Sequence, residues 1–168
     1  MTTRLLVLIF TLLLSACAAT GPGYQAAPLP GNDQARVYVY RVNTFVAGGR
    51  DAYFYVDKKN IADLSVEGYT WFHVPAGEHR FQQKWPVDVG GSPAINLWKL
   101  WKNDESEEVN KKTLQEGYVY WEAGKTYYYR FHTALYGLMG MQWILQEVTA
   151  EQALPEIKKT RLQPSFKK

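Results

Sequence analysis

Most of the chain after residue 34 consists of short runs rich in valine and aromatic residues, separated by turn residues. The first run, R-V-Y-V-Y-R-V-N at residues 36–43, contains residue types that fit a pleated, half-buried surface. Turn-forming stretches such as Pro75-Ala76-Gly77 separate the runs. Seven to eight strands at this spacing predict a mainly β domain, an antiparallel β-sandwich or barrel. The predicted strands are residues 36–43, 52–56, 61–64, 68–74, 78–85, 118–121, 126–133 and 141–148.

A short C-terminal helix is predicted directly after the last strand. Thr149 followed by Gln152 matches a capping box, in which each side chain bonds the backbone of the other residue. Pro155 lies within the predicted helix, where an interior proline usually kinks or ends a helix. The apolar stripe that predicts this helix consists of Ala150, Ala153, Leu154 and Ile157.

An aromatic-rich insertion between Trp85 and Lys112 interrupts the strand pattern. Ser92-Pro93 is a typical N-cap and first-turn pair, so a short helix is expected to follow. One interpretation is a flap that covers a face of the sandwich. The other is a contact with a membrane or partner, where tryptophan and lysine are both favoured. The residues that would make this contact are Trp98, Trp101, Lys99 and Lys102.

The first residues have the pattern of a bacterial signal peptide. Arg4 precedes an apolar run at residues 5–14, which at about ten residues is too short to span a bilayer as a helix. The next residues, L-S-A-C at 14–17, resemble the lipobox of bacterial lipoproteins. The resemblance implies cleavage between Ala16 and Cys17 and attachment of lipid to the Cys17 thiol, for stable membrane anchoring. It also implies outer-membrane sorting, because Ala18 replaces the aspartate that retains many lipoproteins at the inner membrane.

These patterns divide the chain into four parts. Residues 1–16 form the signal peptide, and residues 17–34 comprise the lipidated cysteine and a flexible linker rich in proline and glycine. In an extended form of about 3.1 Å per residue, this linker would hold the domain up to roughly 50 Å from the bilayer. Residues 35–162 form the sandwich domain, and residues 163–168 a basic tail.

Charge and chemistry narrow the range of functions. A net charge of +3 is too small to predict nucleic-acid binding, which needs a strongly basic face. The three histidines, His73, His79 and His132, lack the spacing of metal ligands, so no metal or other cofactor is expected. No nucleophile elbow or phosphate-binding loop occurs, and no catalytic residue is predicted. The sequence therefore favours a protein that is not an enzyme.

Several motifs occur in an order that resembles a family of small bacterial lipoproteins of unknown function, whose domains are predicted β-sandwiches. The motif V-P-A-G-E-H is also similar to a turn of the transthyretin-like repeat domains named for their Pro-Glu-Gly-Ala motif. The resemblance implies a sandwich fold and a location in the cell envelope, but no catalytic or binding residue. The motifs are A-R-V-Y-V-Y-R at 35–41, F-Y-V-D at 54–57, V-P-A-G-E-H at 74–79 and A-G-K-T-Y-Y-Y at 123–129.

The expected function is that of a non-enzymatic interaction or structural module, anchored to the outer membrane and facing the periplasm. A lipid- or glycan-binding domain is the alternative, and an enzyme the more distant one. A deep, aromatic-lined pocket would favour the ligand-binding alternative. The expected partners are the membrane, through the lipid anchor, and an envelope protein or glycan. The sequence leaves the oligomeric state open.

Overall fold

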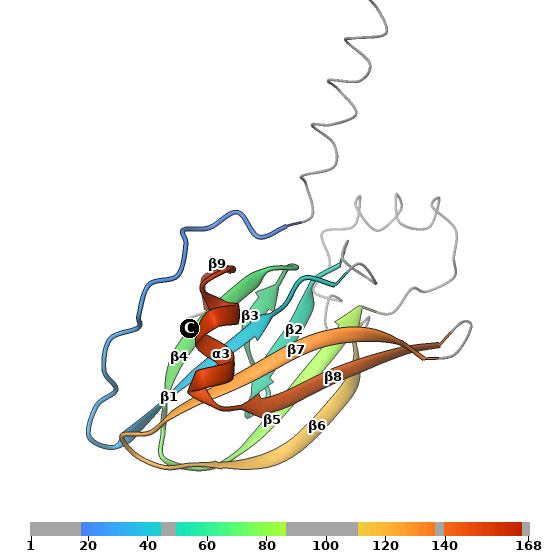
Figure 1. Cartoon of the computed structure of the whole chain (residues 1–168). Helices are drawn as coiled ribbons and strands as arrows, with labels where there is room; N and C mark the ends of the chain where they lie inside the picture. The colour runs from blue at the N-terminus through green and yellow to red at the C-terminus, as the bar shows by residue number, and fades with distance from the viewer. Residues whose placement is uncertain (1–17, 45–49, 87–110, 137–139, 166–168) are drawn as a thin grey trace, which may run out of the picture.

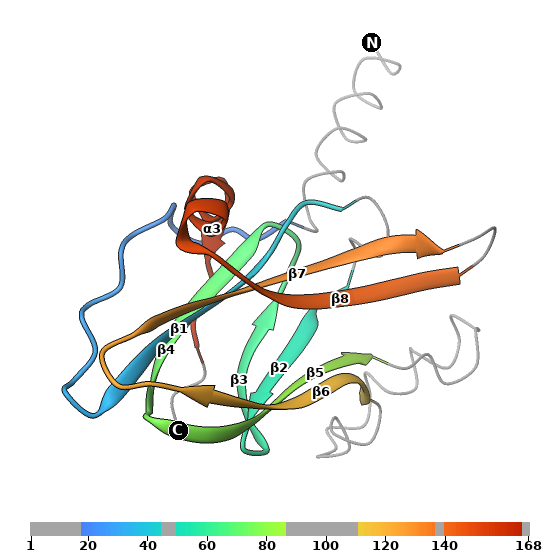
Figure 2. The same cartoon turned by 60° about the horizontal axis from the view of Figure 1, so that its bottom comes forward.

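The computed structural model describes residues 18–44, 50–86, 111–136 and 140–165 (Figure 1). Two sheets pack face to face as a sandwich (Figure 2). The larger sheet has the order β8-β7-β1-β4-β9 and the smaller one β3-β2-β5-β6. The strands are β1 (Gln34–Arg41), β2 (Ala52–Val56), β3 (Lys59–Leu64), β4 (Gly68–Pro75), β5 (Gly77–Pro86), β6 (Lys111–Trp121), β7 (Thr126–Tyr136), β8 (Gly140–Val148) and β9 (Arg161–Leu162).

The predicted mainly β sandwich with a short C-terminal helix is confirmed. Its antiparallel character is not complete, because β1 pairs in parallel with β7 and β4 in parallel with β9. These pairs are not joined by hairpins, so no tight turn dictates their direction. The sequence pattern also predicted one strand too short and missed another. Strand β6 begins at Lys111 instead of residue 118, and the two-residue β9 was not predicted.

The inner core fills the space between the two sheets. Alternate residues of β1, such as Val37 and Val39, point into it and are fully buried. Phe54 of β2 meets Phe131 of β7 edge-to-face, with ring centroids 5.6 Å apart. Other buried members of the inner core are Ala35, Ala52, Val56, Ala62, Leu64, Val74, Phe81, Trp85, Trp121 and Tyr129.

The outer face of the larger sheet is covered by helix α3 (Ala150–Ile157). The predicted capping box of Thr149 and Gln152 is present, and Pro155 lies within the helix. Ala153 and Ile157 pack on the outward tyrosines of the sheet. Glu156 accepts a hydrogen bond of 2.6 Å from the Tyr40 hydroxyl. The outer layer is thus a second buried cluster, formed by Ala27, Tyr38, Tyr40, Tyr69, Ala153 and Ile157.

Residues 18–28, here called the strap, complete this cover and differ from the predicted free spacer. The strap is extended, as its prolines and glycines suggest, but it runs along the domain (Figure 1). Ala19 and Ala27 are buried, and the Ala27 amide donates to the Tyr38 hydroxyl over 2.8 Å. Composition predicted the extended backbone but could not reveal the tyrosine face on which it packs.

Some predictions fall on residues 1–17 and 87–110, which lie outside the described residues. They concern the cleavage between Ala16 and Cys17, the lipid on Cys17, and the contact residues Trp98, Lys99, Trp101 and Lys102. These stay predictions. In the part of the chain that the structure describes, no helix is long and apolar enough to cross a membrane.

Candidate binding pocket beside strand β4

A pocket of about 620 Å³ opens where the ends of β2, β3 and β4 meet. Its apolar lining comes from both sheets, with Ile61 on β3 and Phe72 on β4 among the contributors. Lys59 is exposed on its border, and Ser165 of the C-terminal segment contributes to its wall. The complete lining is Gln34, Val56, Asp57, Lys59, Ile61, Trp71, Phe72, His73, Val74, Pro75, His79 and Ser165.

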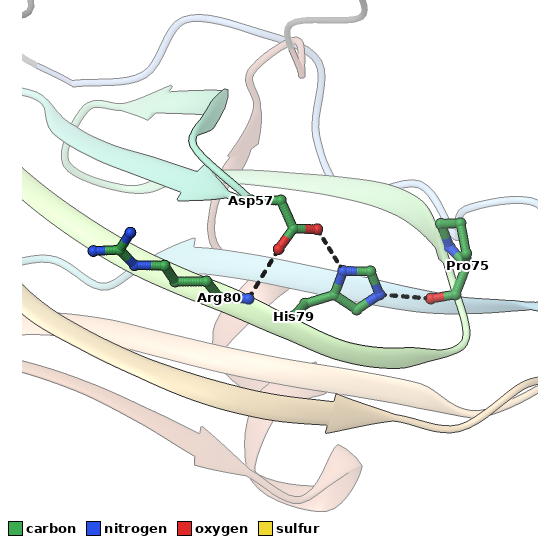
Figure 3. A network of polar contacts seen from close by, with 4 residues as sticks. All are labelled: Asp57, Pro75, His79 and Arg80. Carbon is green, nitrogen blue, oxygen red and sulfur yellow. Dashed lines mark hydrogen bonds and ion pairs between the residues drawn. The ribbon is translucent and has the colours of Figure 1, made fainter.

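A polar network fixes one side of this pocket (Figure 3). Asp57 lies in the tight turn between β2 and β3, where Asp57 and Lys58 have φ of 49° and 70°. Two consecutive residues with positive φ are typical of a two-residue hairpin turn. The Asp57 carboxylate accepts a 3.0 Å bond from the Arg80 amide, and its other oxygen lies 2.7 Å from His79 Nδ1. The network therefore ties the β2–β3 turn to strand β5.

His79 connects this turn to the next one. Its Nε2 lies 2.8 Å from the Pro75 carbonyl oxygen, so both ring nitrogens have partners within the protein. The ring also stacks on Trp121, with centroids 5.1 Å apart. Only 11% of the His79 side chain is exposed, which is consistent with a fixed orientation. His79 thus acts as a structural clasp between the turns.

The electrostatics of Asp57 favour its ionised form. Partial burial acts to raise the pKa of this carboxyl, but the hydrogen bonds from His79 and the Arg80 amide lower it below its usual value. The side chain of Asp57 is 53% exposed, so solvent screens its contact with His79. The pair therefore orients the two turns more than it stabilises the fold.

The other side of the pocket is aromatic and adjoins the strap. The rings of Trp71 and His73 lie 5.3 Å apart on β4. His73 Nε2 lies 3.1 Å from the carbonyl oxygen of Pro28 in the strap. Since these contacts hold His73, the Trp71 and His73 wall is built on β4 and supported by the strap.

A second hollow of about 420 Å³ lies at the opposite flank, where β6 approaches β8. Leu114, Val119 and Leu145 contribute apolar atoms to it. Within it, the Tyr129 hydroxyl accepts a 3.0 Å bond from Trp121 Nε1 and donates over 3.1 Å to Glu147. The first bond links two members of the inner core, and the second reaches the exposed Glu147. The hollow is smaller than the pocket beside β4.

The spacing of His73 and His79 in the sequence argued against a metal site and gave no sign of the pocket. Among the described residues, no group of three or more histidine, cysteine or acidic side chains could hold a metal ion. Asp57 and His79 are 22 residues apart in the chain, and the pairing of β2 with β5 brings them together. The motif V-P-A-G-E-H indicated a turn before His79, but no spacing rule pointed to Asp57.

Residues 31–140 match the model of a protein family of unknown function, DUF2846. The match includes strands β1 to β7 and every pocket-lining residue except Ser165. The strap, α3 and β9 lie outside the matched residues. Neither a curated protein nor a solved structure matches the chain. Because the match spans more than half of the 168 residues, the chain belongs to the DUF2846 family.

Proposed function

We propose that this protein is a lipid-anchored, non-enzymatic binding module of the bacterial cell envelope. The anchor is supported by the apolar run at residues 5–14 and the lipobox-like L-S-A-C at 14–17, with lipid on Cys17. Ala18 after the cysteine favours the outer membrane, with the domain in the periplasm.

The pocket beside β4 is the observation that carries the binding role. Its volume of about 620 Å³ lies within the usual range for ligand sites, roughly 300–1,000 Å³. It combines an apolar surface from Ile61, Phe72 and Val74 with a basic border at Lys59. Such a site fits an apolar group that is attached to a polar one. An apolar side chain on an exposed segment of an envelope protein meets this description.

The polar groups of the pocket support binding over catalysis. Both nitrogens of His79 face acceptor oxygens within the protein, those of Asp57 and Pro75, so neither is directed at a bound substrate. A general acid needs a raised pKa, whereas the pKa of Asp57 is lowered. These two residues therefore serve to shape the pocket.

A small glycan or lipid is the second candidate occupant, and Trp71 is the feature that favours it. An aromatic ring beside polar groups suits a ligand with one apolar and one polar face. Both candidates would occupy the same pocket. A protein occupant should be recovered as a cross-linked partner, and a glycan or lipid as a bound small molecule.

Photo-cross-linking in living cells tests the binding role. A photoreactive residue replaces the exposed Lys59 at the pocket or, as the matched control, the exposed Lys112 on β6. A defined cross-linked protein from position 59 but not 112 is expected, and Ile61→Trp should abolish it by filling the pocket. If a small molecule is the occupant, native mass spectrometry should detect it on the wild-type protein and not on Ile61→Trp. Identical products from both positions, without a bound small molecule, would refute the proposal.

Palmitate labelling tests the anchor separately. Cys17→Ser should abolish incorporation of labelled palmitate and leave the precursor uncleaved. Undiminished labelling in this variant would show that lipid is not attached to Cys17.

A further inference from the structure

The strap is held by specific contacts along its whole length. At its start, Ala18 forms a parallel bridge with Val66, and the Ala19 amide donates to the Val66 carbonyl over 3.0 Å. At its end, the Arg36 guanidinium donates to the carbonyl oxygens of Ala27 and Pro28. Such a series of bonds is unlike a free tether, whose backbone groups bond only water.

Tyrosine hydroxyls and β9 hold the middle of the strap. The Gln25 amide donates to the Tyr69 hydroxyl over 2.9 Å, and the ring of Tyr24 lies 5.7 Å from that of Tyr69. The Leu162 amide donates to the Pro22 carbonyl over 2.7 Å. The strap is therefore an integral part of the outer layer.

Gly21 makes the closest approach of the strap to the domain. A Cβ atom at this position would lie 1.7 Å from the carbonyl oxygen of Leu162, which is backbone and cannot rotate away. At Gly23, by contrast, the nearest atom to such a Cβ is Arg161 Nη1 at 3.8 Å, an ordinary contact. The docked strap thus tolerates a side chain at residue 23 but not at residue 21.

The start of the strap defines one end of the sandwich, here called the near end. It contains the β3–β4 loop with Val66, the residues after β1 with Asn43, and the C-terminal end of α3. Asn43 and Glu67 are joined there by a 2.9 Å hydrogen bond. The near end also carries three exposed basic side chains, Lys158, Lys159 and Arg161. The opposite end of the sandwich, here called the far end, contains the pocket residues Asp57, which follows the last residue of β2, and Pro75, which ends β4.

We infer that the strap seats the near end of the sandwich directly on the membrane surface, with Lys158, Lys159 and Arg161 toward anionic lipid headgroups. The inference rests on the proposed lipid at Cys17. That residue immediately precedes the docked Ala18, so no free spacer remains between the lipid and the domain. Basic side chains near an anionic membrane surface are attracted to it. Since β1 spans eight residues, the pocket is held roughly 25 Å farther out, facing away from the bilayer.

Energy transfer in reconstituted vesicles tests this arrangement. The lipidated full-length protein is inserted into vesicles containing phosphatidylglycerol and an acceptor dye on the headgroups. Because lipid blocks the only native cysteine, a donor dye can be attached to Asn43→Cys at the near end or Ala123→Cys at the far end. Transfer from position 43 should be severalfold greater than from position 123. Equal transfer from the two positions would overturn the inference.

Strap variants test the cause of the orientation. Gly21→Val should release the strap and remove most of the difference between positions 43 and 123, whereas Gly23→Ala should behave like the wild type. If Gly21→Val does not fold, the double variant Tyr38→Phe/Tyr69→Phe removes two strap hydrogen bonds without adding atoms. An undiminished difference in both variants would show that the strap does not set the orientation.

Two further measurements test the headgroup contact and the docking of the strap separately. Lys158→Glu/Lys159→Glu should lower transfer from position 43, and unchanged transfer would refute the headgroup contact. Limited proteolysis of unlipidated protein should cut the strap faster in Gly21→Val than in the wild type, and equal rates would refute docking of the strap. Loss of vesicle attachment with intact strap protection would instead locate the failure in the proposed anchor.

Discussion

The two faces of strand β1 are both buried, but they are built differently. Val37 and Val39 point to the inner core, where they meet the apolar side chains of the second sheet. Tyr38 and Tyr40 point to the outer layer and are equally hidden, with 1% and 0% exposure. Two neighbouring residues of one strand are thus buried by different kinds of cover.

The valines and the tyrosines of β1 differ because the second sheet and the strap place different demands on the side chains beneath them. The second sheet satisfies its backbone groups by lateral pairing, so apolar side chains suffice to fill the space beneath it. The strap is a single extended chain whose amides need partners, and Tyr38 and Tyr69 supply hydroxyl oxygens to two of them. Tyrosine combines a large apolar ring with a polar tip, so it can bury area and satisfy backbone at once. We therefore expect the stability of the inner core to depend on the volume of its side chains, and that of the outer layer to depend on its hydrogen bonds.

Trp121→Ala should give the largest loss of stability, because it empties the inner core. The side chain is fully buried and packs against Phe81, Phe72 and His79. A loss of about 3–5 kcal/mol in the free energy of unfolding is expected from urea titration. Tyr120→Ala is the control, since its side chain is 68% exposed, and its effect should stay within about 0.5 kcal/mol. Similar losses in both variants would contradict the inner-core assignment.

Tyr40→Phe tests the outer layer while leaving its volume almost unchanged. The variant removes the 2.6 Å hydrogen bond to the Glu156 carboxylate, which keeps its 3.1 Å ion pair with Arg130. A loss of about 1.5–3 kcal/mol in the free energy of unfolding is expected for a hydrogen bond to a charged group. Tyr128→Phe serves as the control, because Tyr128 stacks on Tyr38 through its ring. If Tyr40→Phe leaves the free energy of unfolding unchanged, the stability of the outer layer also depends on side-chain volume alone.

Thr149→Ala removes the cap of α3 and should weaken the outer layer by about 1 kcal/mol. The Thr149 hydroxyl accepts from the Gln152 amide over 3.4 Å, and Gln152 returns a 3.3 Å contact to the Thr149 amide. Thr149→Ser keeps the hydroxyl and should retain nearly full stability. Equal unfolding midpoints for the alanine and serine variants would mean that the cap contributes nothing.

Alkaline titration should give the smallest effect and again report on the outer layer. Burial, followed by the proximity of Tyr38, raises the pKa of Tyr24 in the strap to about 12. The pKa of a tyrosine in the unfolded chain is about 10. The contribution of Tyr24 to the free energy of unfolding is therefore complete below pH 10 and is lost as the pH rises from there toward 12. Burial lowers the pKa of Arg41 to about 10, which acts in the opposite direction over the same range.

Because Arg41 titrates in both proteins, a comparison of the wild type with a Tyr24 variant isolates the effect of Tyr24. The free energy of unfolding of the wild type and of Tyr24→Phe is followed from pH 8 to pH 11. The wild type should lose more stability above pH 10 than the variant, because only it carries the ionising phenol. Parallel curves would show that the Tyr24 phenol is not protected by the outer layer.

The sequence predicted the strands whose patterns are strongest and missed those whose residues are mostly polar. The range of β2 at Ala52–Val56 was predicted without error, and the capping box of α3 was confirmed. The first half of β6, K-K-T-L-Q-E-G, was missed because lysine, glutamine and glutamate are common in loops. β6 is an edge strand, where charged residues help to prevent pairing with other chains.

By itself, the sequence determined the local structure of this protein. Strand periodicity, turn residues and the helix cap depend on residues within a few positions of one another, so they can be read along the chain. The tertiary structure alone decided the parallel pairing of β1 with β7, the clasp between Asp57 and His79, and the docking of the strap. These features join residues far apart in the chain, and the loss of chain entropy is offset only when the whole sandwich packs. The candidate pocket belongs to this second group, because strands from both sheets form its wall.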